Sequence, residues 1–397
     1  MGSEMNMSSR RYDVDWLRVL VIIAVFIFHS GRFFDLTDWH VKSPVVYASV
    51  QAWTTFLVGW LMPLIFVISG ASLFYAVGKG GVLAFMRDKV LRLLVPLVVG
   101  VFTHVALAVY LERVSHHQFS GSFLSFYPHY FDGMYAFGGN FAWMGLHLWY
   151  LLVLFLCSII FLPLFYLFKG PARGALRAFG SFLAMPGAVF VLVIPVAWLS
   201  MVLDPRSGLG QRGFGGWPVP VYVCYLFYGF IIFSHERLQE QIERMRPFHL
   251  CLALAASAFL LWWFRYLPPG RGAKVGISFG FPFLIGSWSW MLAFMGFARA
   301  HLTRSTPFLA YANEAVLPFY IMHQTVLLVV GYLVLPWHIP DPAKWLVIAA
   351  ISFAVVMAIY EFAVRRSNVL RVLFGMKVIH GRPQGALEPA LCGKPQP

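Results

Sequence analysis

Long apolar stretches separated by short polar and often basic segments make up most of the chain. A helix needs about 20 residues to cross a hydrocarbon core of about 30 Å. Stretches of roughly that length occur at 15–34, 53–77, 91–111, 146–168, 182–203, 219–234, 249–267, 279–298, 311–335 and 343–363. They are continuous, whereas strands of a membrane barrel would alternate apolar and polar residues over about ten positions. The pattern predicts an all-α polytopic membrane protein, a bundle of about ten transmembrane helices.

The composition supports a membrane environment. Of the 397 residues, 60% are hydrophobic and 12% are charged, and the mean hydropathy is +0.73. Soluble globular chains carry about 25% charged residues, so a water-soluble fold is excluded. The first apolar stretch leads into FHSGRFFDLTDWH (28–40) rather than a small-residue cleavage site, so we expect a retained helix and not a signal peptide.

The distribution of Lys and Arg predicts the orientation, because basic loops stay on the cytoplasmic side. With the N-terminus inside, the inner segments hold 20 of the 30 basic residues and the outer segments hold nine, while Arg18 lies within the first helix. Both termini are therefore expected in the cytoplasm. The net charge of +14 is spread over these loops, which favours contact with anionic lipid and not with nucleic acid.

One membrane domain is expected to account for nearly the whole chain. We assign it to residues 1–378, and we assign residues 379–397, which are rich in Gly and Pro, to a flexible cytoplasmic tail. No internal repeat of the kind seen in many transporters is found. The four cysteines do not form the short-spaced pairs of zinc or redox motifs, so no metal site is predicted.

The first helix carries a polar stripe in DWLRVLVIIAVFIFH (15–29). Arg18 and His29 are 11 residues apart, which leaves them about 20° past three full turns, on one face, and about 16 Å apart along the axis. A charge in hydrocarbon costs about 2.5–3.5 kcal/mol on insertion scales and usually marks a functional path. The alternatives are that Arg18 anchors the helix at the lipid interface and that His29 packs against a neighbouring helix.

An arginine followed by ten residues and a histidine in the first helix resembles the acyltransferase 3 family. Its members are ten-helix membrane proteins that transfer acyl groups to carbohydrates outside the cytoplasm. Segments 61–75 (LMPLIFVISGASLFY) and 88–97 (DKVLRLLVPL) are similar to further motifs of the family, with Lys89 in place of the first arginine of an Arg-x-x-Arg pair. Segments 147–155, 317–326 and 360–377 resemble its glucan biosynthesis protein C branch.

The resemblance implies a donor, an acceptor and a location. The donor is cytoplasmic acyl-CoA, either succinyl-CoA or acetyl-CoA, and no cofactor is bound permanently. Arg18, Lys89 and Arg92 would bind the CoA phosphates, with Asp15 orienting Arg18. His29 would act as general base on an acceptor hydroxyl or as a transient acyl carrier. The partners are acyl-CoA, a carbohydrate and the lipid of a bacterial inner membrane, and no oligomeric state is predicted.

Three other polar residues near the ends or the middle of helices are candidates. His147 and Glu112 are placed with His29 as catalytic candidates on the outer side. His147 would orient His29 or the acceptor, or else lie at the membrane interface. Glu112 would orient His29 or pair with Arg113. His323 is a candidate for substrate binding, and a packing hydrogen bond between helices is the alternative.

The outer segment 119–143 is rich in aromatic residues. Ten of its 25 residues are Phe, Tyr or Trp, compared with 18% in the whole chain. Aromatic rings can stack on sugars, so Tyr127, Tyr130 and Asp132 are candidates for acceptor binding. The alternative is an aromatic belt at the membrane interface.

Two other functions are compatible with a polytopic membrane protein. A transporter or flippase of a lipid-linked or small solute would move its cargo without acyl transfer. A receptor or scaffold would bind without turnover. Neither requires an arginine and a histidine on one stripe of the first helix.

Overall fold

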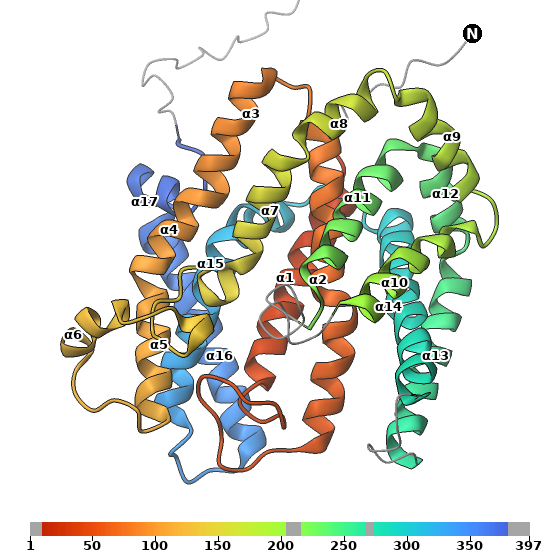
Figure 1. The fold of residues 1–397 in the computed structure, drawn as a ribbon. Helices are drawn as coiled ribbons and strands as arrows, with labels where there is room; N and C mark the ends of the chain where they lie inside the picture. Colours follow the sequence, from red (N-terminus) through yellow and green to blue (C-terminus); the bar gives the residue numbers. More distant parts are fainter. Residues whose placement is uncertain (1–9, 204–215, 267–273, 380–397) are drawn as a thin grey trace, which may run out of the picture.

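The computed structural model describes residues 10–203, 216–266 and 274–379 (Figure 1). Their regular structure is helical apart from one isolated bridge between Met134 and Phe141. Six helices in these ranges are long and apolar enough to span a membrane, and four bent helix pairs raise the possible number of spans to ten. The fold is therefore that of a multi-pass membrane protein, while the exact number of spans and the side of the termini remain predictions.

Six of the candidate spans are continuous helices. They are α1 (Tyr12–Gly31), α2 (Ala48–Ala76), α13 (Arg246–Tyr266), α14 (Lys274–His301), α15 (Pro307–Val334) and α16 (Asp341–Ile359). The bent pairs are α3 and α4 (Gly81–Lys89 and Val95–Phe102) with α5 (His104–Ser115), α7 (Trp149–Ile160) with α8 (Leu162–Lys169), α9 (Arg173–Leu183) with α10 (Val193–Val202), and α11 (Val219–Ser234) with α12 (Glu236–Arg244). Two short helices, α6 (Phe123–Phe126) and α17 (Asn368–Leu373), complete the arrangement.

Local chemistry explains two of the breaks. Between α4 and α5, which bend by 41°, the Thr103 hydroxyl donates to the carbonyl of Val99 at 2.6 Å, and such back-bonding bends helices. Between α11 and α12, which bend by 100°, the His235 imidazole accepts from the backbone N–H of Leu238 and caps α12. The sequence predicted a single helix over 91–111, and the break at Thr103 is a difference from that expectation.

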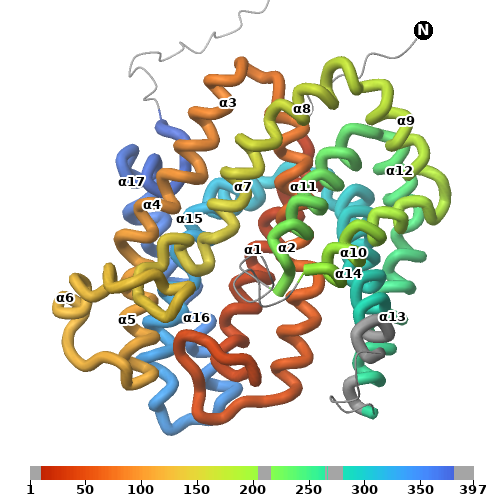
Figure 2. Tube along the Cα trace, viewed as in Figure 1, coloured from red at the N-terminus to blue at the C-terminus, as the bar shows by residue number. Residues whose placement is uncertain are grey.

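Helix α2 forms the centre of the bundle, beside α1 (Figure 2). It is largely buried, whereas α13 and α16 are largely exposed. A Cβ atom at Gly70 would lie 1.9 Å from the Leu226 carbonyl oxygen, and one at Gly229 would lie 1.9 Å from that of Val67. The two glycines therefore let the backbones of α2 and α11 touch, as small residues do at helix interfaces in membranes.

Candidate functional site

Arg18 lies on the N-terminal half of α1 and is held by three neighbours. Its guanidinium donates to Asp15 at 2.9 Å, to Asn313 of α15 at 3.1 Å and to Ser72 of α2 at 3.0 Å. The contact with Asp15 is the one expected from their spacing. Since the partners come from three helices, the guanidinium is fixed in one orientation and not left free to reach lipid phosphates.

A cavity of about 270 Å³ opens beside Arg18. Arg18, Lys89 and Arg92 all line it, although the two segments that carry them are far apart in the sequence. Lys89 and Arg92 come together at a π-helical turn over Val90–Leu94, a distortion that is frequent at functional sites. Asp88 pairs with each of them only loosely, at 3.8 and 3.9 Å, so their charge is largely available to a ligand.

Two tyrosines and a serine also line this cavity. The hydroxyls of Tyr150 and Ser69 are hydrogen-bonded at 2.7 Å. Tyr320 packs edge to face on Tyr150, with ring centroids 5.7 Å apart, and its hydroxyl donates to the carbonyl of His147. His29 does not line the cavity in the described part of the chain. Tyr320 connects the two sites, because it lines the cavity and its ring also contacts His323.

His29 and His323 form a hydrogen-bonded pair near the C-terminal end of α1. His29 Nδ1 lies 2.8 Å from His323 Nε2, and His323 Nδ1 lies 2.6 Å from the carbonyl oxygen of Tyr320. A carbonyl only accepts, so His323 carries its proton on Nδ1 and accepts from His29 Nδ1 through its Nε2. His29 Nε2 then holds a free lone pair. The side chain is half-buried, and no hydrogen bond engages His29 Nε2 within the described residues.

His147 does not contact His29 as its predicted orienting role required. Its Nε2 donates to the carbonyl of Ile321 at 2.9 Å, and its ring packs edge to face on His323 at 5.2 Å. The residue that orients His29 in the structure is His323, from α15. His147 therefore supports the partner of His29 rather than His29 itself.

Glu112 is buried near the C-terminal end of α5, where it gathers three side chains. Arg113 donates to it at 2.9 Å and Tyr135 donates to it at 2.7 Å, while His40 Nδ1 forms a short contact with its second oxygen. Of the two roles considered for Glu112, the pairing with Arg113 is present and the contact with His29 is not. Sequence reasoning missed His40, which ends the polar segment 28–40.

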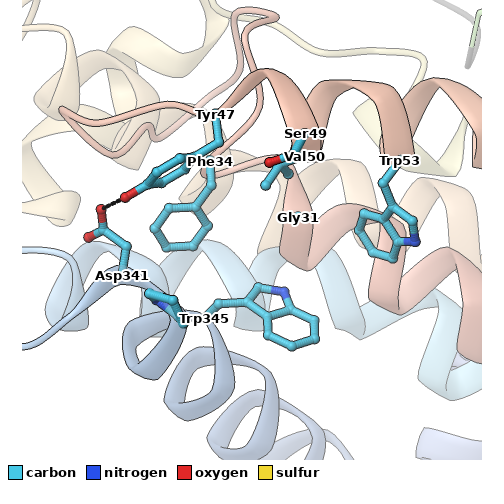
Figure 3. A pocket seen from close by; sticks show the side chains of 9 residues that line it. Gly31, Phe34, Tyr47, Ser49, Val50, Trp53, Asp341 and Trp345 are labelled. Carbon is cyan, nitrogen blue, oxygen red and sulfur yellow. Dashed lines mark hydrogen bonds between the residues drawn. The ribbon is translucent and has the colours of Figure 1, made fainter. Parts of the chain in front are cut away.

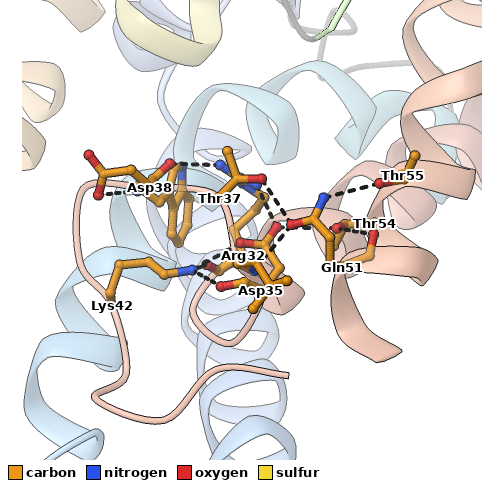
Figure 4. Close-up of polar contacts among 10 residues, drawn as sticks. Arg32, Asp35, Thr37, Asp38, Lys42, Gln51, Thr54 and Thr55 are labelled. Carbon is orange, nitrogen blue, oxygen red and sulfur yellow. Dashed lines mark hydrogen bonds and ion pairs between the residues drawn. The ribbon is translucent and has the colours of Figure 1, made fainter. Parts of the chain in front are cut away.

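A polar cluster fixes the loop that carries His40 (Figure 4). Asp35 is completely buried and accepts from Arg32 at 2.5 Å, from Lys42 at 2.9 Å and from Thr54 at 3.2 Å. Burial lowers the pKa of the Lys42 ammonium. These contacts tie the end of α1 to the start of α2. The loop between them is therefore held over His29, where the Trp39 ring lies parallel to the His29 ring, with centroids 6.1 Å apart.

The aromatic segment 119–143 packs on the end of α4. Tyr127 and Tyr130 donate to the carbonyls of Phe102 and Val101 at 2.9 and 3.0 Å, and Tyr130 is completely buried. Both hydroxyls thus satisfy helix carbonyls rather than point to an acceptor. Asp132 is exposed and pairs with His129 at 2.9 Å.

A larger, mostly apolar cavity of about 410 Å³ lies on the opposite side of α1 (Figure 3). Gly31, Trp53 and Trp345 line it, and a hydrogen bond of 2.7 Å from Tyr47 to Asp341 crosses one edge. Gly31 is two residues after His29, which places it about 200° around the helix. This cavity is therefore separate from the histidine pair.

No group of three His, Cys, Asp or Glu side chains that could hold a metal ion occurs in the described ranges. Comparison with curated proteins and with solved structures gives no match. Residues 11–361, nearly the whole chain, match the family model of the acyltransferase 3 group, described as an acyltransferase domain. Together with its apolar helices, this match shows that the chain belongs to the acyltransferase 3 family of membrane acyltransferases.

Proposed function

We propose that this acyltransferase moves a succinyl or acetyl group from cytoplasmic acyl-CoA to hydroxyls of a carbohydrate outside the cytoplasm. Similarity of segments 147–155, 317–326 and 360–377 to glucan biosynthesis protein C supports a periplasmic glucan as acceptor. A bacterial inner membrane gives one protein access to both substrates. Acyl-CoA is consumed as a substrate in this reaction.

The observation that carries the proposal is the convergence of Arg18, Lys89 and Arg92 on one cavity. Coenzyme A is a polyanion, and cations that converge on a pocket bind phosphates through charge-assisted hydrogen bonds. Arg18 also lies at the end of α1 that the distribution of basic residues assigns to the cytoplasm. These features support CoA as the carrier of the acyl group.

The histidine pair supports chemistry at the other end of the same helix. The Nε2 lone pair of His29 can take a proton from an acceptor hydroxyl or attack the thioester carbonyl. In either case positive charge develops on the His29 ring. His323 stabilises that charge by accepting the hydrogen bond from His29 Nδ1, as the third group of a catalytic triad does.

The separation of the two sites suits a reaction across the membrane. The helical rise from Arg18 to His29 is about 16 Å, roughly half the hydrocarbon thickness. A CoA molecule anchored by its phosphates near Arg18 would extend its thioester arm toward His29. The acceptor would remain on the opposite side of the membrane.

Sidedness in oriented proteoliposomes tests the proposal. Labelled succinyl-CoA or acetyl-CoA is supplied on the cytoplasmic face and a β-glucan oligosaccharide on the other, and acylated glucan is measured by mass spectrometry. We expect product in this arrangement only. Product formed when both substrates are confined to the cytoplasmic face would contradict transfer across the membrane, and solute flux without loss of acyl-CoA would support a transporter instead.

A further inference from the structure

Besides the His29–His323 pair, the structure contains a second oriented histidine at the same end of α1. His40 Nδ1 contacts the carboxylate of Glu112, and no hydrogen bond is made by His40 Nε2 in the described part of the chain. The His40 side chain is 12% exposed, which leaves it enclosed but within reach of a ligand. A carboxylate on one ring nitrogen fixes the tautomer and leaves the other nitrogen as a proton acceptor.

Further side chains hold the Glu112 carboxylate of the His40–Glu112 dyad in place. Tyr135 donates to the Glu112 carboxylate at 2.7 Å, and burial raises the pKa of the Tyr135 phenol, so that it stays protonated and donates. Arg113 pairs with the other carboxylate oxygen at 2.9 Å. Two donors and an imidazole thus hold one buried carboxylate in a fixed orientation.

The indole of Trp39 lies beside both oriented histidines. Its centroid lies 6.1 Å from that of His29 and 5.7 Å from that of His40. Both imidazoles therefore lie next to one aromatic ring. An aromatic face beside catalytic groups is suited to a sugar, whose C–H surface stacks on it while its hydroxyls reach the polar groups at the edges.

We propose that His40 is the general base for the acceptor hydroxyl, positioned by Glu112, while His29 carries the acyl group. This inference rests on the acyl-transfer function proposed above. It assigns separate tasks to the two histidines, since an acylated His29 Nε2 has no lone pair left to take a proton.

Acyl transfer through His29 takes place in two steps. In the first, His29 Nε2 attacks the thioester carbonyl, the C–S bond breaks and CoA leaves as a thiolate that takes a proton from water. In the second, the acceptor oxygen attacks the acyl carbon while His40 Nε2 takes the hydroxyl proton. The C–N bond then breaks, its electron pair returns to His29 Nε2, and His40 releases the proton to water.

The two half-reactions can be measured separately on the purified full chain in nanodiscs. Exchange of the acyl group between acyl-CoA and isotope-labelled CoA, without acceptor, reports the first step. Transfer to a β-glucan oligosaccharide reports both. For His40→Gln we expect exchange within about twofold of wild type and transfer reduced by about 10²-fold or more, the usual contribution of a general base. His338→Gln, an exposed histidine outside these contacts, is the matched control and should leave both unchanged.

Chemical rescue separates a base from a structural residue. For His40→Gly we expect added imidazole to restore transfer at least tenfold, with no effect on the exchange. The role of His40 would be overturned if both His40 variants lost exchange and transfer equally. It would also be overturned if both variants kept full exchange and full transfer. Transfer by wild type without any exchange would overturn the acyl-His29 step. Absence of both activities in wild type would instead contradict the proposed function itself.

Discussion

The two ends of α1 differ in what surrounds their polar residue. Around Arg18 the neighbours are carboxylate, amide and hydroxyl groups beside an open cavity, and its side chain is 31% exposed. Around His29 the neighbours are rings, those of His323, Trp39 and Phe28. The first environment suits binding of a hydrated anion, and the second suits nucleophilic or proton-transfer chemistry at a fixed nitrogen. We therefore expect α1 to separate binding from chemistry, and mutations should separate them too.

Replacing His29 should produce the largest effect and should leave the other end of α1 untouched. Gln can accept a hydrogen bond but cannot take up a proton or an acyl group at neutral pH. For His29→Gln we expect acyl transfer to fall by about 10³-fold or more, with CoA affinity unchanged. Isothermal titration with CoA measures the affinity, and mass spectrometry of the glucan measures acyl transfer. Weaker CoA binding in this variant would show that the two ends are not separate.

Replacing His323 should produce an intermediate effect on the same step. Leu fills a similar volume but cannot accept from His29 Nδ1, so the His29 ring loses its fixed tautomer. We expect His323→Leu to lower the rate of transfer by about 10²-fold with little change in the KM for acyl-CoA. His323→Gln, which keeps an acceptor oxygen, should recover part of the rate. Equal transfer rates for the Leu and Gln variants would mean that His323 contributes packing between helices and not the hydrogen bond to His29.

Changes at the Arg18 end should have the smallest effect on the chemical step and should act on binding. Arg18→Ala removes one cation from a polyanion site, and we expect the Kd for CoA to rise by about tenfold, or about 1.4 kcal/mol. The loss should shrink as salt is added, because ions screen phosphate contacts. Arg87→Ala, which removes an exposed neighbouring cation that does not line the cavity, is the control. Equal Kd values for the two variants would refute the donor site.

The sequence predicted the features that depend on one helix at a time. Apolar length predicted the candidate spans, and the period of the helix placed Arg18 and His29 on one stripe. The contact between Asp15 and Arg18 follows from a spacing of three residues. These features depend on rise and rotation per residue, which are the same in any α-helix.

Contacts between distant segments were the part that sequence reasoning missed. His29 and His323 are separated by 294 positions, so no periodicity relates them. The sequence leaves His323 between substrate binding and a hydrogen bond to a neighbouring helix, and it does not identify His29 as the partner. His40 sits in a loop whose path is set by the buried Asp35. The break at Thr103 depends on one side-chain hydrogen bond within an apolar run that otherwise resembles a single span.

The edge-to-face packing of Tyr150 and Tyr320 bears on proton movement across the membrane. A bacterial inner membrane maintains a proton gradient, and a continuous wet path from Arg18 to His29 would let protons leak through it. In this structure the two rings pack edge to face, and each hydroxyl is occupied by a hydrogen bond. In the bacterial inner membrane that we propose, these rings would therefore restrict proton movement between the cavity and His29 whenever no acyl-CoA arm lies between them.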